Sequence, residues 1–232
     1  MQSVANYFKG LVYPGRNIVV GRNTRGELFF TYAIMGRSST SRNRVFKKDG
    51  ESIKTEAFDP SIIMDPSLII YNAVREFKNT WIVTNGNQTD TIYDAFSSGD
   101  TFENALDTRE YEDDDPSWTP RISALVIPNA EKGKSILKMA ILKNQNNHCR
   151  RFFYNYSEIE KDTAFIIQTY EDSKDPLVSF SKDPVEVSLD GLNTIDEISS
   201  NIFDSLNSDN RISLLGRNIN TEKEIIINSR KK

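Results

Sequence analysis

The chain has 232 residues, of which 38% are apolar, 10% aromatic and 27% charged, and its formal net charge is −4. This composition is typical of a globular protein with enough apolar material for a packed core. The negative net charge argues against a nucleic-acid coat protein, whose usual mark is a basic surface. No apolar run approaches the roughly 20 residues that a membrane-spanning helix needs. We therefore expect neither nucleic acid nor a membrane as a partner.

Strand patterns come first along the chain. A β-branched run at 17–21 and an aromatic and apolar run at 27–35 flank the turn residues 23–26 and predict a hairpin. Two more strands are predicted at 67–74 and 80–84. After Asn85-Gly86 the apolar residues take helical spacing, which predicts helices over 90–97 and, capped by Thr101, over 102–106.

Strands return in the second half of the chain, at 121–127, 135–143, 149–156 and 164–170. Thr194 and Glu197 form a capping-box pattern that opens a helix, and two strands follow at 211–215 and 224–227. Runs of strands separated by helices indicate an α+β fold rather than an alternating parallel sheet. Two antiparallel sheets packed together, with helices on their outer faces, would bury all of these apolar stripes. We find no internal boundary or repeat and predict one domain over residues 1–232.

The first part of the chain is strongly basic. Residues 1–48 hold a single acid, Glu27, against Lys9, Arg16, Arg22, Arg25, Arg37, Arg42, Arg44, Lys47 and Lys48, whereas acidic residues are densest over 110–115. An ordinary mixed surface would explain this asymmetry. The alternative is a basic pocket that binds an anionic metabolite.

The most distinctive segment follows the predicted strand at 27–35. Gly36 opens a turn that contains Arg37, Ser38, Ser39, Thr40, Ser41, Arg42, Asn43 and Arg44. Arginine presents five donors in a planar fork that suits phosphate and carboxylate oxygens, and serine hydroxyls can complete the shell. These arginines, with Arg16, predict an anion site. The competing interpretation is that one or more of them pair with the acidic residues 110–115.

Other polar residues allow two interpretations each. Tyr71 ends an apolar run, so its phenol is either a proton donor in a pocket or a satisfied core hydroxyl. Asn85 is either part of a plain turn or, with backbone N–H groups before the helix, part of an oxyanion site. Arg121 either lies near the same cleft or pairs with the acidic loop. His148 and Cys149 are too few for a zinc site and, as strand neighbours, point to opposite faces.

Several motifs occur in an order that resembles the IMP cyclohydrolase family, the archaeal-type enzymes and their bacterial relatives. They are Tyr13-Pro14-Gly15-Arg16, the run from Met35 to Phe46, Asp65-Pro66-Ser67-Leu68-Ile69-Ile70-Tyr71, Thr84-Asn85-Gly86-x-Gln88-Thr89-Asp90 and Thr119-Pro120-Arg121-Ile122-Ser123, with weaker matches at Thr169-Tyr170, 176–180 and 210–214. The resemblance covers nearly the whole chain. One departure is Gln168, where the family pattern leads us to expect a histidine.

The resemblance implies a four-layer α-β-β-α fold similar to N-terminal nucleophile hydrolases. It also implies closure of a formamido-imidazole-carboxamide ribotide to inosine monophosphate, with loss of water, in purine biosynthesis. The chain begins Met1-Gln2-Ser3, and the implied reaction needs no N-terminal nucleophile and no covalent acyl intermediate. No metal or redox cofactor is expected, and the partner is a small-molecule purine ribotide.

For this reaction we predict a catalytic set and a substrate-binding set of residues. The catalytic set is Arg37, Tyr71, Asn85 and Glu112, the last singled out by its family-like spacing before Thr119-Pro120-Arg121. The substrate-binding set is Arg16, Ser38, Ser41, Arg42, Arg44 and Arg121. Two alternatives stay open on the same fold: a related nucleotide amide hydrolase, and a nucleotide-binding protein without activity.

Cysteine usage and the N-terminal residues bear on location. The single cysteine excludes an intramolecular disulfide, and a reducing cytoplasm is the natural setting for such a chain. The first residues show no charged start followed by an apolar core, so no signal peptide is predicted. Self-association into a homo-oligomer stays open.

Overall fold

The computed structural model describes residues 1–62, 69–128 and 130–230. Its elements, in chain order, are α1 (Val4–Lys9), β1 (Asn17–Arg22), β2 (Leu28–Met35), β3 (Val45–Asp49), β4 (Ser52–Glu56), the 3-10 turn η1 (Pro60–Ile62), β5 (Asn72–Phe77), β6 (Thr80–Thr84), α2 (Gln88–Ser97), α3 (Phe102–Asp107), β7 (Arg121–Val126), β8 (Leu137–Gln145), β9 (His148–Tyr156), β10 (Thr163–Gln168), β11 (Val185–Ser188), α4 (Ile195–Ser205), β12 (Arg211–Asn218) and β13 (Glu224–Asn228). Within this part of the chain, no helix has the length and apolar character needed to cross a bilayer.

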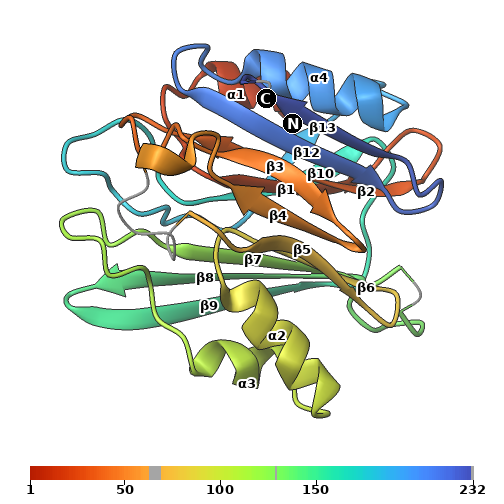
Figure 1. Cartoon of the computed structure of the whole chain (residues 1–232). Helices are drawn as coiled ribbons and strands as arrows, with labels where there is room; N and C mark the ends of the chain where they lie inside the picture. The colour runs from red at the N-terminus through yellow and green to blue at the C-terminus, as the bar shows by residue number, and fades with distance from the viewer. Residues whose placement is uncertain (63–68, 129, 231–232) are drawn as a thin grey trace.

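The strands form two antiparallel sheets that face each other (Figure 1). The six-stranded sheet has the order β11-β10-β1-β2-β12-β13, and the seven-stranded sheet has the order β3-β4-β5-β6-β7-β8-β9. The middle of the chain, from β3 to β9, therefore builds one sheet, while the segments before and after it build the other. The predicted hairpin is confirmed, because β1 pairs with β2 across the turn after Arg22.

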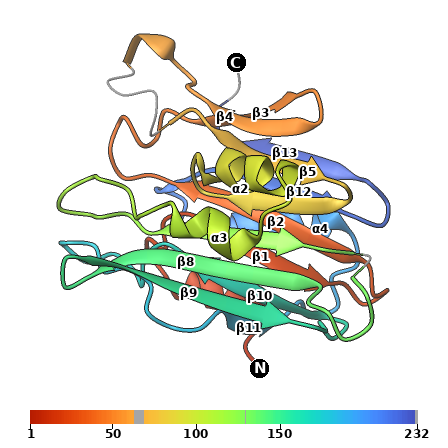
Figure 2. The same ribbon diagram turned by 90° about the horizontal axis from the view of Figure 1, so that it is seen from below.

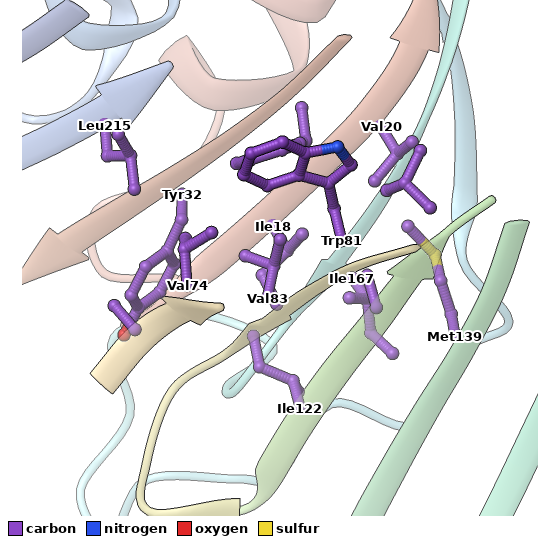
Figure 3. Packing of buried hydrophobic residues seen from close by; sticks show 14 of the residues in the cluster. Ile18, Val20, Tyr32, Val74, Trp81, Val83, Ile122, Met139, Ile167 and Leu215 are labelled. Carbon is purple, nitrogen blue, oxygen red and sulfur yellow. The ribbon is translucent and has the colours of Figure 1, made fainter. Parts of the chain in front are cut away.

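Three apolar clusters separate four layers. The first lies between the sheets and includes Ile18, Tyr32 and Trp81 (Figure 3). The second packs α1 and α4 against the outer face of the six-stranded sheet, and the third packs α2 and α3 against the outer face of the seven-stranded sheet (Figures 1 and 2). Alternation along β1 explains the arrangement: Ile18 points between the sheets while Val19 points towards the helices.

Two predicted helix starts are confirmed. Thr194 accepts a hydrogen bond from the backbone N–H of Glu197, and the Glu197 side chain caps the N-cap backbone in return, which completes the capping box of α4. Thr101 caps α3 by accepting from the backbone N–H of Asn104.

Some predicted boundaries are wrong. The strand predicted at 67–74 begins only at Asn72, with residues 67 and 68 outside the described residues, and the strand predicted to reach residue 170 ends at Gln168. The sequence pattern did not predict α1, β3, β4 or β11. These elements have six residues or fewer, and the last three residues of β3 are exposed, so apolar periodicity is weak in them.

Candidate active site

A cavity of about 280 Å³ opens at the end of the sandwich where β1 and β7 begin and β2 and β10 end. It is lined by the segments that precede β1 and β7, by the segment that follows β10 and by the turn after β2. Five of the residues predicted to bind substrate or to act in catalysis line the cavity: Arg16, Arg37, Ser38, Ser41 and Arg44. The predicted catalytic residue Glu112 lines the same cavity.

Arg16 and Glu112 form an ion pair that crosses between the sheets. Arg16 Nη2 donates to Glu112 Oε2 at 2.8 Å, and the two side chains are only 8% and 6% exposed. Burial alone would lower the pKa of Arg16, but the Glu112 carboxylate and three nearby phenols raise it well above its ordinary value. The Arg16 guanidinium is therefore a permanent positive charge in the lining of the cavity.

The backbone fixes where Arg16 enters the cavity. The preceding Gly15 has a φ of 74°, and a Cβ at this position would collide with Thr169 and Tyr170. Glycine adopts this conformation without steric cost. The Arg16 N–H then donates to the Thr169 hydroxyl at 3.1 Å, which ties the start of β1 to the end of β10.

Arg44 is a buried cation that forms no ion pair with any residue the structure describes. It is 7% exposed, its Nε has no hydrogen-bond partner, and among the described residues none forms an ion pair with its guanidinium. The Nε of Arg16 is likewise unpaired. Burying an unmatched charge is costly. The cavity therefore presents positive charge and unpaired N–H donors, which suit an anion or a strong hydrogen-bond acceptor.

Two phenols lie close to these guanidinium groups. The hydroxyls of Tyr32 and Tyr71 are 2.6 Å apart, and both side chains are buried. Burial raises the pKa of Tyr71, while Arg44 and Arg16 partly counter that effect. Burial also raises the pKa of Tyr32 well above its usual range. Both phenols are thus neutral at physiological pH and can donate hydrogen bonds.

Arg37, Ser38 and Ser41 form the rim of the cavity. The guanidinium carbon of Arg37 lies 5.0 Å from the centre of the Tyr13 ring, and Tyr13 stacks on Tyr170. The hydroxyls of Ser38 and Ser41 are 3.0 Å apart. Arg37 and Ser38 are exposed, so this rim can hold a strongly hydrated anion without removing it fully from water.

A chain of hydrogen bonds that no sequence pattern predicted joins three further lining residues, Asp114, Thr119 and Tyr170. Asp114 accepts from the Thr119 N–H at 2.6 Å and from the Thr119 hydroxyl, and that hydroxyl lies 2.6 Å from the Tyr170 hydroxyl. Thr119 and Tyr170 both belong to the motifs of the family resemblance. The sequence did not distinguish Asp114 as a site residue, because it stands within a run of acidic residues.

Besides Tyr71, whose phenol is buried in the core against Tyr32, three predicted residues do not line the cavity. Arg42 donates to the carbonyls of Gly36 and Asp209. The Asn85 amide donates to Pro120 O at 2.9 Å and accepts from the Ile122 N–H at 2.8 Å. These contacts fasten the turns around the site, and a direct role for Arg42 or Asn85 in binding or catalysis stays a prediction.

Arg121 is the third of these residues. Its Nε donates to Glu110 O at 2.7 Å and its Nη1 to Gln88 Oε1 at 2.9 Å. Arg121 therefore contacts the acidic loop through a backbone carbonyl. The sequence suggested either a place near the cleft or an ion pair with a carboxylate of that loop, and this contact is neither. A role for Arg121 in substrate binding also stays a prediction.

Gln168 has a structural environment of its own. It is buried, accepts a hydrogen bond from the Tyr7 hydroxyl at 3.0 Å and donates to Tyr170 O at 2.7 Å. The amide thus holds the segment that carries Tyr170 into the cavity wall. Across the described residues, no group of three or more His, Cys, Asp or Glu side chains gathers in an arrangement that could hold a metal ion.

Comparison with known proteins agrees with this geometry. A family model described as "IMP cyclohydrolase-like protein" matches residues 13–223. The chain belongs to this family. The matched range includes every residue that lines the cavity, from Tyr13 to Leu177.

Individual relatives come from methanogenic archaea. The IMP cyclohydrolase of Methanococcus aeolicus is 31% identical over 122 residues, which cover 51% of this chain and 60% of the relative. That of Methanocaldococcus jannaschii is 32% identical over 120 residues, or 51% of this chain and 58% of the relative. An IMP cyclohydrolase of Methanococcus maripaludis is 29% identical over 165 residues, or 69% and 75%. The first two alignments thus span less than two thirds of the relatives' length.

Proposed function

We propose that this protein is an IMP cyclohydrolase, which closes 5-formamidoimidazole-4-carboxamide ribotide to inosine monophosphate and releases water. The observation that carries the proposal is the pair of buried arginines in one cavity, Arg16 and Arg44, the second of which has no counter-ion in the described part of the chain. Membership in the IMP cyclohydrolase-like family and the names of the archaeal relatives support it.

The reaction requires a carboxamide nitrogen to attack a neighbouring formamide carbon. The nitrogen lone pair is delocalised into its own carbonyl, and the formamide is a weak electrophile. Both groups sit on one ring, so proximity is partly built in and the protein has to fix the reactive rotamer. It must also stabilise negative charge on the formyl oxygen and move protons.

The burial of each arginine suggests which end of the ribotide it meets. A guanidinium stabilises developing charge most strongly where water is excluded, so we assign Arg16 and Arg44 to the oxygens of the base. The phosphate remains strongly hydrated and fits the exposed rim of Arg37, Ser38 and Ser41. This assignment moves Arg37 from the catalytic role that the sequence suggested to a binding role.

Glu112 and Tyr71 supply the groups for proton transfer and hydrogen bonding. The Glu112 carboxylate, held by Arg16, can accept a hydrogen bond from the carboxamide NH2. Tyr71, neutral and paired with Tyr32, can donate towards the polarised oxygen. Positioned acid–base groups of this kind contribute roughly 10²- to 10⁴-fold to a rate.

We further infer that the four layers are arranged as in N-terminal nucleophile hydrolases, as one domain over residues 1–232 that works in the cytoplasm. The two facing antiparallel sheets with helices outside are compatible with that fold. Here an arginine, Arg16, stands directly before the first strand and lines the cavity, which suits a reaction without a covalent acyl intermediate.

The test is incubation of the purified protein with the formylated ribotide while the purine absorbance is followed. Formation of inosine monophosphate supports the proposal, and Arg44→Met should slow it. Release of formate without ring closure would favour the related amide hydrolase. Binding of inosine monophosphate without any turnover would favour a nucleotide-binding protein that lacks activity.

A further inference from the structure

Two carboxyl groups line the same cavity but have different surroundings. Glu112 forms the ion pair with Arg16 at 2.8 Å and is almost fully buried. Asp114, two residues later, forms no ion pair within the described part of the chain and is half-buried. Where two carboxyl groups share a site and their environments differ in this way, one commonly works as the acid and the other as the base.

The groups around Asp114 favour retention of its proton. Burial raises the pKa of Asp114, and the negative charge of Glu112 adds to that effect, while the two hydrogen bonds from Thr119 and the charge of Arg16 act in the opposite direction. Two other titratable or charged groups lie near Asp114. The Tyr170 hydroxyl contacts the Thr119 hydroxyl, and Arg37 lies on the rim of the same cavity. The net direction is upward, which favours the protonated form of Asp114.

Resting on the function proposed above, we propose that Asp114 is the general acid that completes ring closure. Addition of the carboxamide nitrogen to the formyl carbon leaves a ring carbon that bears a hydroxyl. Asp114 gives its proton to that hydroxyl, the C–O bond breaks, and water departs. The C=N bond forms as the adjacent ring nitrogen loses its proton, which returns to Asp114, so the enzyme ends unchanged.

The hydrogen bonds place Asp114 for this role. Thr119 binds one carboxyl oxygen through its N–H and the other through its hydroxyl, which fixes the plane of the group. Each oxygen can still make a further hydrogen bond towards the cavity. Tyr170 in turn contacts the Thr119 hydroxyl, so the orientation of Asp114 depends on the segment that follows β10.

The experiment compares pH profiles of kcat for the wild type, Asp114→Asn, Asp113→Asn and Thr119→Val. Asp113 is the exposed neighbour in the same loop and serves as the matched control. We expect Asp114→Asn to lower kcat by roughly 10²- to 10⁴-fold with little change in KM, because an amide cannot supply the proton. Asp113→Asn should behave as wild type.

Thr119→Val provides an independent readout. The Thr119 hydroxyl stabilises the ionised form of Asp114, so its loss should move the alkaline limb of the kcat profile to higher pH. A structural role for Asp114 would lower activity at every pH without moving that limb.

The outcomes separate the two proposals. A wild type that never forms inosine monophosphate overturns the proposed function and the acid role with it. Turnover by the wild type with an unchanged kcat in Asp114→Asn, or an unmoved alkaline limb in Thr119→Val, overturns the acid role alone. Binding of inosine monophosphate and thermal melting of each variant identify any loss that comes from misfolding.

Discussion

Replacement of Arg44 by methionine should change ligand binding and stability in opposite directions. Arg44 is 7% exposed and has no counter-ion among the described residues, so burial of its charge destabilises the free protein. Methionine keeps much of the volume and removes the charge. The unliganded variant should therefore gain free energy of unfolding, by about 1 kcal/mol or more.

Binding of inosine monophosphate should weaken at the same time. A hydrogen bond to a charged group contributes about 1.5–3 kcal/mol, which corresponds to a roughly 10- to 150-fold rise in Kd. Titration calorimetry with inosine monophosphate measures the affinity, and urea unfolding without ligand measures the stability. Arg42→Met provides the comparison, because Arg42 donates to two carbonyls outside the cavity lining.

An Arg44→Met variant that is less stable than the wild type and binds inosine monophosphate with unchanged Kd would contradict both expectations. An Arg42→Met variant that weakens binding as much as Arg44→Met does would favour the sequence-based assignment instead.

Three other predictions follow from contacts described above. Arg16→Met should cost about 3–5 kcal/mol of unfolding free energy, because it leaves the Glu112 carboxylate buried alone; urea unfolding checks this, and a loss below 1 kcal/mol contradicts it. Thr194→Ala removes the N-cap of α4 and should cost about 1 kcal/mol, seen as a lower urea midpoint; an unchanged midpoint would mean that the cap is redundant. The raised pKa of Asp114 favours its protonated form in the folded state, so its contribution to stability is present at acidic pH and is lost as pH rises through the folded pKa. Asp114→Asn should therefore gain stability relative to the wild type as pH rises over that interval, and parallel stability curves would argue against a raised pKa.

The elements that the sequence predicted well have strong local patterns. The hairpin of β1 and β2 combines two apolar runs with a turn, and the capping box of α4 is visible in four residues. The missed strands β3, β4 and β11 lie at or near sheet edges, where exposed faces dilute the apolar periodicity. Their place depends on neighbours distant in the sequence, which a local pattern does not encode.

The residues of the site likewise divide into those that a local sequence pattern predicted and those that it did not. The basic turn after β2 predicted an anion site, and Arg37 and Arg44 do meet there, but Arg42 points elsewhere because the turn directs successive side chains differently. The ion pair of Arg16 with Glu112 joins residues 96 positions apart. No spacing rule identifies such a pair, and only the family-like spacing before Thr119 singled out Glu112. Asp114 could not be told from its acidic neighbours without knowledge of burial.

The strand order has a consequence for how the protein is made. The hairpin of β1 and β2 is flanked by β10 and β12, which leave the ribosome only after the whole seven-stranded sheet has been synthesised. A nascent chain must therefore carry that early hairpin with both hydrogen-bonding edges unsatisfied for more than a hundred codons. Such delayed, long-range pairing favours slow folding, and it makes the period before β10 emerges the time when assistance from chaperones would matter most.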